Sequence, residues 1–191
     1  GGLSFYQIYA LEQAQAERSV GNSLTRHIQS AEFYLARQEN SYRGFLVSGD
    51  PYYIERAEAH RESFKKEVKA IREEGAPSIA AAAQATDAAG DEWFEHVVVG
   101  GRALAENAET QARAVRMVGR DGSADAVMGK VEDSLDAMKA AIQVELEKGR
   151  ARYENANTAL AWTLLVGLGA ALVISFGVGF ILTRSISGPI A

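Results

Sequence analysis

Cysteine is absent from this chain of 191 residues, and proline occurs only three times. Without cysteine the chain has no disulfide, no c-type haem attachment and no thiolate metal site. The compartment stays open, because a chain with enough buried surface needs no disulfides in an oxidising space. Few prolines, together with abundant Ala, Glu, Gln, Lys and Arg, are typical of long helices. The composition therefore predicts an all-α fold.

Charge is absent from a long stretch near the C-terminus, between Glu154 and Arg184. Within it, residues 160–182 carry only two polar side chains, Thr163 and Ser175. At about 1.5 Å of rise per residue this stretch reaches roughly 34 Å, against a hydrocarbon core of about 30 Å. A buried helix of a soluble protein would usually carry charges on a solvent face. The stretch therefore predicts a transmembrane helix, with bounds at 159–183.

The N-terminus is also apolar, since residues 1–11 are uncharged and the first charge is Glu12. Eleven residues are too few to span a bilayer. Tyr6 and Tyr9 suit the headgroup level of a membrane, where aromatic rings gather. We predict that residues 1–11 are the tail of a first transmembrane helix, with an ordinary soluble N-terminus as the alternative.

Patterns that carry chemistry are scarce. The part before the membrane stretch has a net charge of −6, because Arg184 is the only charged residue after that stretch begins and the whole chain carries −5. Nucleic acid is therefore not expected as a partner. Di-iron bundles need Glu-x-x-His pairs, but no glutamate stands three residues before His27, His60 or His96. We predict no catalytic residue, no metal and no cofactor.

Apolar residues recur at alternating steps of four and three, which keeps one face of a helix against its partners. The pattern predicts a first helix over about 3–47, ended by a turn at 48–51, and a second helix that follows it. It also predicts a last helix that runs without a break from about residue 123 into the membrane. We expect an elongated antiparallel four-helix bundle over 12–158. The expected buried positions are Leu24, Ile28, Ala31, Leu35, Gln38, Tyr42 and Phe45, then Ile54, Ala57, Arg61, Phe64, Val68 and Ile71, then Met128, Val131, Leu135, Met138, Ile142, Leu146, Gly149 and Tyr153.

The middle of the bundle admits two interpretations. Equal path lengths up and down the bundle favour a chain reversal over 88–92, at Gly90, with only a kink at Pro77. The alternative reverses the chain at 75–77. Residues 97–101 form a weak point in any helix that crosses them, because they combine three valines with two glycines. The third helix is expected to bury Leu104, Ala108, Gln111, Val115 and Val118.

One motif lies at the first turn, where Glu39, Arg43-Gly44-Phe45-Leu46 and Gly49-Asp50 follow one another. It resembles the signature of the third class of CHASE-type extracellular sensor domains, and residues 118–129 resemble the last hairpin of the same family. The resemblance covers most of 15–155. It implies a helical-bundle sensor on the outer side of a membrane.

The C-terminal tail, residues 184–191, is similar to the start of a HAMP linker, in which a basic residue leaves the membrane and a proline opens the first linker helix. Together the resemblances imply a receptor in a bacterial inner membrane with a periplasmic or extracellular ectodomain. Among the possible cytoplasmic outputs, the resemblance favours that of a methyl-accepting chemotaxis protein, with a histidine kinase or a diguanylate cyclase as the alternatives. We expect a homodimer, an unknown small-molecule or protein ligand, and cytoplasmic signalling partners for regions outside this sequence. A non-sensing dimerisation stalk is the rival hypothesis.

Two further sets of residues are candidates for binding. In bundle receptors that this chain resembles, arginines at the membrane-distal end bind ligand carboxylates, which marks Arg43, Arg113, Arg116 and Arg120; a solvated basic stripe is the alternative. In the membrane helix small residues recur every four positions, which allows close helix contacts. Central among these predicted packing positions are Gly167, Ala171, Ser175 and Gly179.

Overall fold

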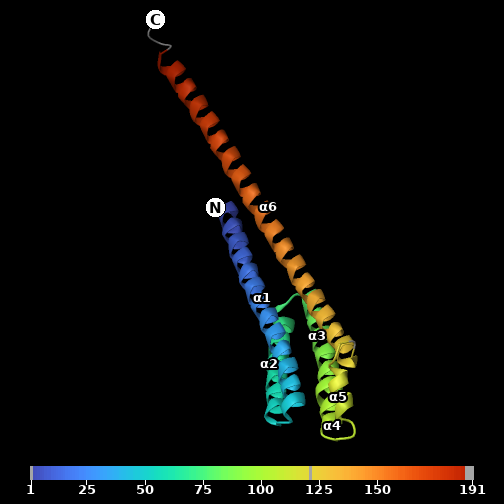
Figure 1. The fold of residues 1–191 in the computed structure, drawn as a ribbon. Coiled ribbons are helices and arrows are strands. Elements are labelled where there is room, and N and C mark those ends of the chain that lie inside the picture. The colour runs from blue at the N-terminus through green and yellow to red at the C-terminus, as the bar shows by residue number, and fades with distance from the viewer. Residues whose placement is uncertain (1, 121, 188–191) are drawn as a thin grey trace. The chain divides into compact units, whose positions relative to one another are not determined.

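The computed structural model describes residues 2–120 and 122–187, and the secondary structure of this part is entirely helical (Figure 1). The all-α prediction is therefore confirmed. The elements are α1 (Gly2–Ser48), α2 (Tyr52–Glu74), α3 (Pro77–Trp93), the π-helix η1 (Phe94–Val99), α4 (Gly100–Ala105), α5 (Gln111–Met117) and α6 (Ser123–Ser187).

The chain forms two compact units. One unit is Ala16–Glu147, called the bundle below. The other combines Gly1–Gln15 with Lys148–Ala191. Helices α1 and α6 each contribute to both units.

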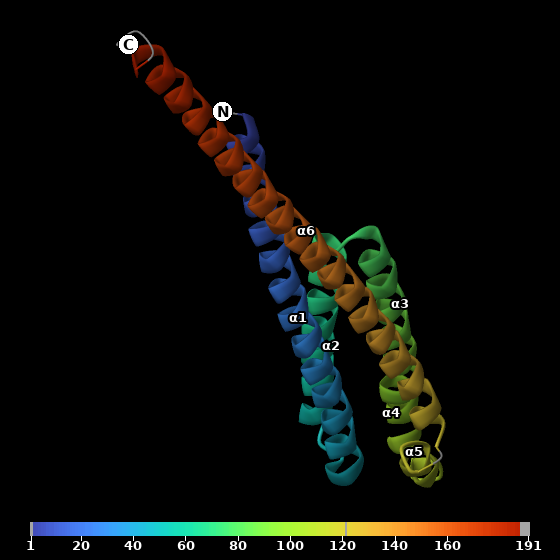
Figure 2. The same cartoon turned by 90° about the horizontal axis from the view of Figure 1, so that it is seen from above.

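The bundle consists of four helical rods, because α3, η1 and α4 follow one another without a gap (Figures 1 and 2). Cross-helix contacts show that neighbouring rods are antiparallel. Along α1 and α2, His27 contacts Glu67 and, further along α1, Gly44 lies against Tyr53. The other antiparallel pairs are α2 with α3–η1 (Lys65–Asp87 and Arg61–Glu95), α1 with α6 (Glu32–Lys139) and α3–η1 with α6 (Glu92–Lys130 and His96–Ser123). The predicted antiparallel four-helix bundle is confirmed.

The predicted buried positions of α1 and α2, and those of α6 as far as Leu146, form the core or pack against it. Tyr153, also expected to be buried, is exposed. All seven expected positions of α1 are buried, including the polar Gln38. In α2 only Arg61 of the expected positions is half-buried rather than buried. The turn between the two helices follows the sequence prediction, since Gly49 takes a positive φ of 71° and the N–H of Tyr52 donates to Asp50 Oδ1 at 2.9 Å. A left-handed backbone at this place favours glycine.

The predicted reversal at Gly90 is wrong. The chain reverses at Gly75 and Ala76, whose ψ angles of 156° and 161° are extended, and Pro77 opens α3. Proline disfavours a helical residue before it but suits the first position of a helix. The path-length argument failed because it counted residues as far as Val118 in the third rod, whereas this rod ends at Ala105. The shorter rod removes much of the excess length that argued against a reversal at 75–77.

Gly90 lies inside α3 for a packing reason. A Cβ at this position would lie 2.7 Å from Cε1 of Phe64, a buried ring of α2. The bare backbone of Gly90 thus lets α2 and α3 approach each other. A second close approach joins α1 and α6 where both continue beyond the α2–α3 turn: a Cβ at Gly21 would overlap Cδ2 of Leu146.

The predicted seam of the third helix is also wrong. The rod ends at Ala105, and Ala108, Gln111 and Val115 are exposed. The short α5 buries Ala114 instead. The error begins at η1, whose wider turn shifts the phase of every residue after it, so that a spacing of three and four no longer follows the buried face.

Helix α6 runs unbroken for 65 residues, as predicted. It is the one helix in the described part of the chain that is long and apolar enough to cross a membrane, and none of its most apolar window is buried. The predicted packing face at Gly167, Ala171, Ser175 and Gly179 is exposed, so its role stays a prediction. Residues 188–191 of the predicted linker start lie outside the described residues.

Two glycine substitutions test the close packing of α2 and α3. Gly129→Ala in α6 adds a Cβ that meets nothing within 4 Å, so we expect it to raise the free energy of unfolding by about 0.5–1 kcal/mol. Gly90→Ala should instead lower it by about 1–2 kcal/mol, because overpacking against Phe64 outweighs the better helix propensity. Urea unfolding followed by circular dichroism measures both. Equal stabilisation by the two variants would contradict the close approach.

Candidate functional site

The signature residues build the turn between α1 and α2. Arg43 Nη2 pairs with Glu39 Oε1 at 2.6 Å along α1. Gly44 admits the ring of Tyr53, whose Cδ1 would lie 2.7 Å from an added Cβ, and Phe45 is buried in the core. With the positive φ of Gly49, these contacts fix how α2 returns along α1. Leu46 packs against the core and Asp50 caps α2.

Helix α5, which carries two of the predicted arginines, lies at the same end of the bundle as this turn (Figure 1). Arg113 and Arg116 stand on α5, and Arg120 follows it; all three are exposed. None of the three makes an ion pair with another described residue, whereas Arg43 is held by Glu39. The structure thus offers exposed positive charge at this end of the bundle. Its use by a ligand stays a prediction.

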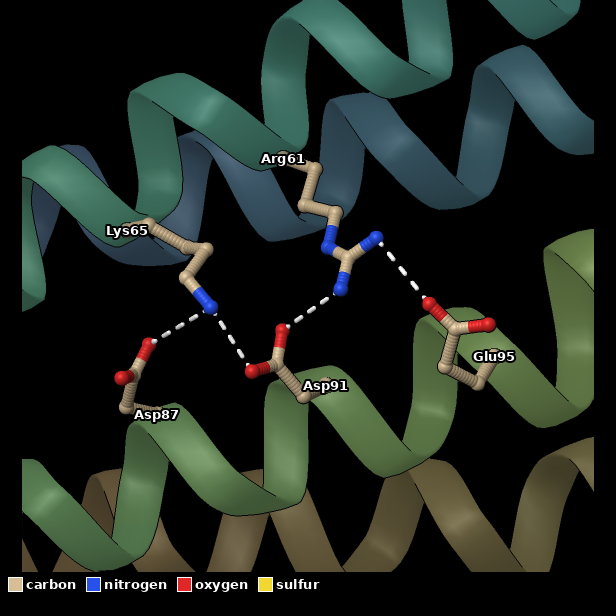
Figure 3. Close-up of polar contacts among 5 residues, drawn as sticks. All are labelled: Arg61, Lys65, Asp87, Asp91 and Glu95. Atoms are coloured by element: carbon tan, nitrogen blue, oxygen red, sulfur yellow. Dashed lines mark hydrogen bonds and ion pairs between the residues drawn. The ribbon is translucent and has the colours of Figure 1, made fainter.

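A chain of ion pairs, called the charge ladder below, joins α2 to α3 and η1 (Figure 3). Arg61 places its two terminal nitrogens 2.8 Å from Asp91 Oδ1 and 3.2 Å from Glu95 Oε1. Lys65 Nζ lies 2.7 Å from Asp91 Oδ2 and 3.6 Å from Asp87 Oδ1. Two cations therefore alternate with three carboxylates along one face of the hairpin.

The charged groups of the charge ladder stabilise one another's ionised forms. Burial alone would raise the pKa of Asp91, but hydrogen bonds from Lys65 and Arg61 hold it below its ordinary value. The hydrogen bond to Asp91 likewise raises the pKa of Lys65. The sequence showed Arg61 as a lone polar residue on a buried face. Its partners could have been found from the spacing of Asp87, Asp91 and Glu95 at steps of four, which places them on one helix face.

The charge ladder ends on the π-helix η1. The Arg61 guanidinium lies 4.3 Å from the ring centroid of Phe94, the first residue of η1, and it also holds Glu95, the second. Such a cation over an aromatic face is attractive. The weak point predicted over residues 97–101 is confirmed, since η1 covers its three valines and ends at Val99. π-turns in α-helices are frequent at functional sites.

On its other side the rod meets a buried tyrosine of α1. Tyr42 is fully buried, and its Oη occupies the place where a Cβ of Gly101 would stand. Burial raises the pKa of Tyr42 to about 12. Neither Tyr42 Oη nor Nε2 of the buried Gln38 has a hydrogen-bond partner among the described residues. Sequence reasoning missed this contact, because nothing in the spacing shows which side chain faces a glycine.

Two histidines link α1 and α2 in different ways. His27 Nδ1 lies 2.5 Å from Glu67 and its Nε2 lies 3.5 Å from Glu74, so the ring bridges two carboxylates. His60 stacks on Tyr34 at 6.1 Å between ring centroids and has Arg56 as its polar neighbour. Burial first, and then the charges of Arg56 and Arg37, lower the pKa of His60.

These residues hold the helices together through packing contacts and ion pairs. Within the described ranges no group of three His, Asp or Glu side chains is placed to hold a metal. The cross-helix contacts instead fix the relative positions of four helices, and three of them involve η1: Arg61 with Glu95, Arg61 with Phe94, and His96 with Ser123.

Residues 21–152 match the CHASE3 domain family. The chain belongs to the CHASE3 family. The match covers more than half of the sequence and nearly the whole bundle, so the bundle is an extracytoplasmic sensor domain. CHASE3 domains occur in signalling receptors such as histidine kinases and chemoreceptors. Together with the apolar part of α6, this places the CHASE3 domain in a membrane protein. Searches among curated proteins and among solved structures gave no match.

The charge ladder is tested by Arg61→Ala. We expect this variant of the CHASE3 domain to lose about 1–3 kcal/mol of unfolding free energy, because half-buried carboxylates lose charged hydrogen bonds. The matched control is Lys69→Ala on the same helix, whose pair with Glu73 is 3.6 Å long and largely exposed. It should cost about 0–0.5 kcal/mol. Equal losses in urea unfolding would show that the ladder adds nothing beyond a surface pair.

The lowered pKa of His60 predicts a dependence on pH. Because the unfolded state binds a proton more readily at this residue, stability is lost as pH falls through the unfolded pKa of about 6.5. His60→Gln removes this contribution, so the variant should lose less stability than the parent between about pH 7.5 and about pH 5.5. Both proteins keep His27, so the difference in their urea midpoints isolates His60. Parallel pH profiles would contradict the prediction.

Proposed function

We propose that the protein is a transmembrane receptor whose CHASE3 domain senses a ligand or a partner and relays a helix displacement to a cytoplasmic output. The observation that carries the proposal is α6, which starts as a core helix of the bundle and continues without a break through the apolar stretch. An unbroken helix of this kind is a direct covalent route for motion from the bundle to the membrane. The resemblance of residues 184–191 to a HAMP start gives the direction of the signal.

Sensing is favoured over a passive stalk by the irregularities of the bundle. A stalk needs one unbroken seam, whereas this bundle contains a π-helix and a reversal at Gly75 short of the full length of α1. It also buries Tyr42 and Gln38 with unpartnered polar atoms in the described core, which costs stability. Such features suit a body that changes its packing.

Among outputs we rank a chemotaxis receptor first, with a histidine kinase or a diguanylate cyclase as alternatives. All three classes carry similar ectodomains, so the segment that follows a HAMP linker decides. A long Ala- and Glu-rich helical hairpin there would support chemotaxis, and a dimerisation helix with a histidine would support a kinase. The proposed setting is a homodimer in the bacterial inner membrane, with the distal arginines as candidates for an anionic ligand.

A cross-link between α1 and α6 tests the relay without knowledge of the ligand. Glu32 of α1 and Lys139 of α6 form an ion pair across the two helices, so a bifunctional maleimide that spans the reach of these two side chains can join cysteines at the two positions. We would place Glu32→Cys and Lys139→Cys together in the full-length protein, in a chain that has no other cysteine in residues 1–191. Cross-linking should drive the output, read as kinase or cyclase activity in membranes, to one extreme.

The controls are the two single-cysteine variants treated with the same maleimide and the double variant before treatment. All three should behave as the parent does, because they hold no link between the helices. A stalk has no relative motion to block. A cross-linked pair with unchanged output would therefore contradict the proposed function.

A further inference from the structure

The rod made of α3, η1 and α4 contains two alternative sets of apolar positions that could face the core. Up to Trp93 the buried positions follow steps of four and three. Continued as an α-helix, the pattern would next bury Val97, Gly100 and Leu104. The structure instead buries Gly101 and packs Ala105 against the core, one residue later in each case. Both sets are apolar, and both contain a glycine at the same step.

The two glycines differ in what they do. Gly101 must be bare because the Tyr42 hydroxyl occupies the place of its Cβ. Gly100 has no such neighbour: a Cβ there would meet only the carbonyl oxygen of Glu95, at an ordinary 3.4 Å. Glycine at position 100 weakens the helix without serving the present packing. It would serve a register in which residue 100, rather than 101, faces Tyr42.

Residues 97–101, where the two sets of buried positions diverge, have little intrinsic preference for their present helical conformation. Their three valines are β-branched and their two glycines are weak helix formers, so little helix propensity opposes a change. The π-turn absorbs one extra residue. Tyr42 Oη, which lies against Gly101, and Gln38 Nε2, one turn earlier in α1, lack hydrogen-bond partners among the described residues. Unpartnered buried groups raise the free energy of this packing relative to a competitor.

We propose that the rod exchanges between two registers, with η1 as the element that converts. In the second register η1 is an α-helix, Gly100 replaces Gly101 against Tyr42, and Leu104 replaces Ala105 at the core. With α3 held by the charge ladder, residues 100–105 turn by about 100° and move by about 1.5 Å, the geometry of one residue in an α-helix.

The exchange has a direct route to α6. The ring of His96 in η1, the element that converts, lies 3.4 Å from Ser123 Oγ at the start of α6. The chain that follows α4 also leads through α5 into α6. A shift of α4 therefore displaces the first turns of α6. This last step rests on the proposed function, whereas the exchange itself does not.

Reciprocal alanine variants in residues 1–191 test the exchange. Gly101→Ala puts a Cβ onto the Tyr42 hydroxyl and should favour the second register; Gly100→Ala is tolerated in the present register and should retain it. Single cysteines at 104 or 105 report the register through their reactivity with a maleimide. We expect residue 105 to be the better protected in the parent and in Gly100→Ala, and residue 104 in Gly101→Ala.

A deletion provides the second test, which does not depend on the folding of Gly101→Ala. Removing the exposed Val99 takes out the extra residue, so η1 becomes α-helical while Gly101 and Ala105 keep their present places. This variant should fold with a melting temperature at or above that of the parent. Removing Ala88, which is equally exposed but lies in the α-helical part of the rod, should unfold the bundle.

The outcomes separate the two proposals. A folded Gly101→Ala variant in which residue 105 stays the better protected overturns the register exchange, and so does a Val99 deletion that unfolds as the Ala88 deletion does. If Gly101→Ala does not fold, the deletion pair alone decides whether the exchange stands. A reversed reactivity order with unchanged output in the full-length protein instead sustains the exchange and contradicts the proposed relay.

Discussion

The bundle depends on phase: each of its four rods must turn its buried side chains towards the same axis over its whole length. Helix α1 sets this phase, because its seam alternates steps of four and three without interruption from Leu24 to Phe45. Helix α2 follows it along most of its length, with Arg61 as the polar exception. In the third rod a π-turn shifts the buried positions by one residue, from Gly100 to Gly101. The hairpin contacts, the charge ladder and the glycine contacts all serve to hold this alignment.

Sequence reasoning succeeded where phase is kept by α-helical spacing alone. The seams of α1, α2 and α6, the turn at Gly49 and the unbroken α6 all follow from periodicity and capping, which are local properties. It failed where the decisive neighbour is distant in sequence. Gly90 looks the same whether it ends a helix or admits the ring of Phe64, and only the fold distinguishes the two. The π-turn was visible as a weak point, but its effect on the following seam was not.

The candidate site shows the same division. The signature of the first hairpin could be read as a motif, and the structure gives its residues roles in shaping the turn. The charge ladder could be read in part, from Arg61 and the spacing of three carboxylates. The contact between Tyr42 and Gly101 could not, because it joins α1 to a rod whose register depends on η1. Tertiary contacts of this kind distinguish the CHASE3 domain from a regular four-helix bundle, and the helical periodicity of the sequence does not reveal them.

The early reversal at Gly75 has a mechanical consequence. Because α2 ends and α3 begins at this turn, neither helix extends beyond it, and the bundle narrows from four helices to two. Beyond the turn α1 and α6 continue beside each other, in contact at Gly21 and Leu146. A cross-section of two helices resists bending and twisting far less than one of four. The four-helix part of the domain is therefore stiffer than the two-helix part formed by α1 and α6. A change of packing in the four-helix part is released in the two-helix part as sliding or rotation of α1 against α6.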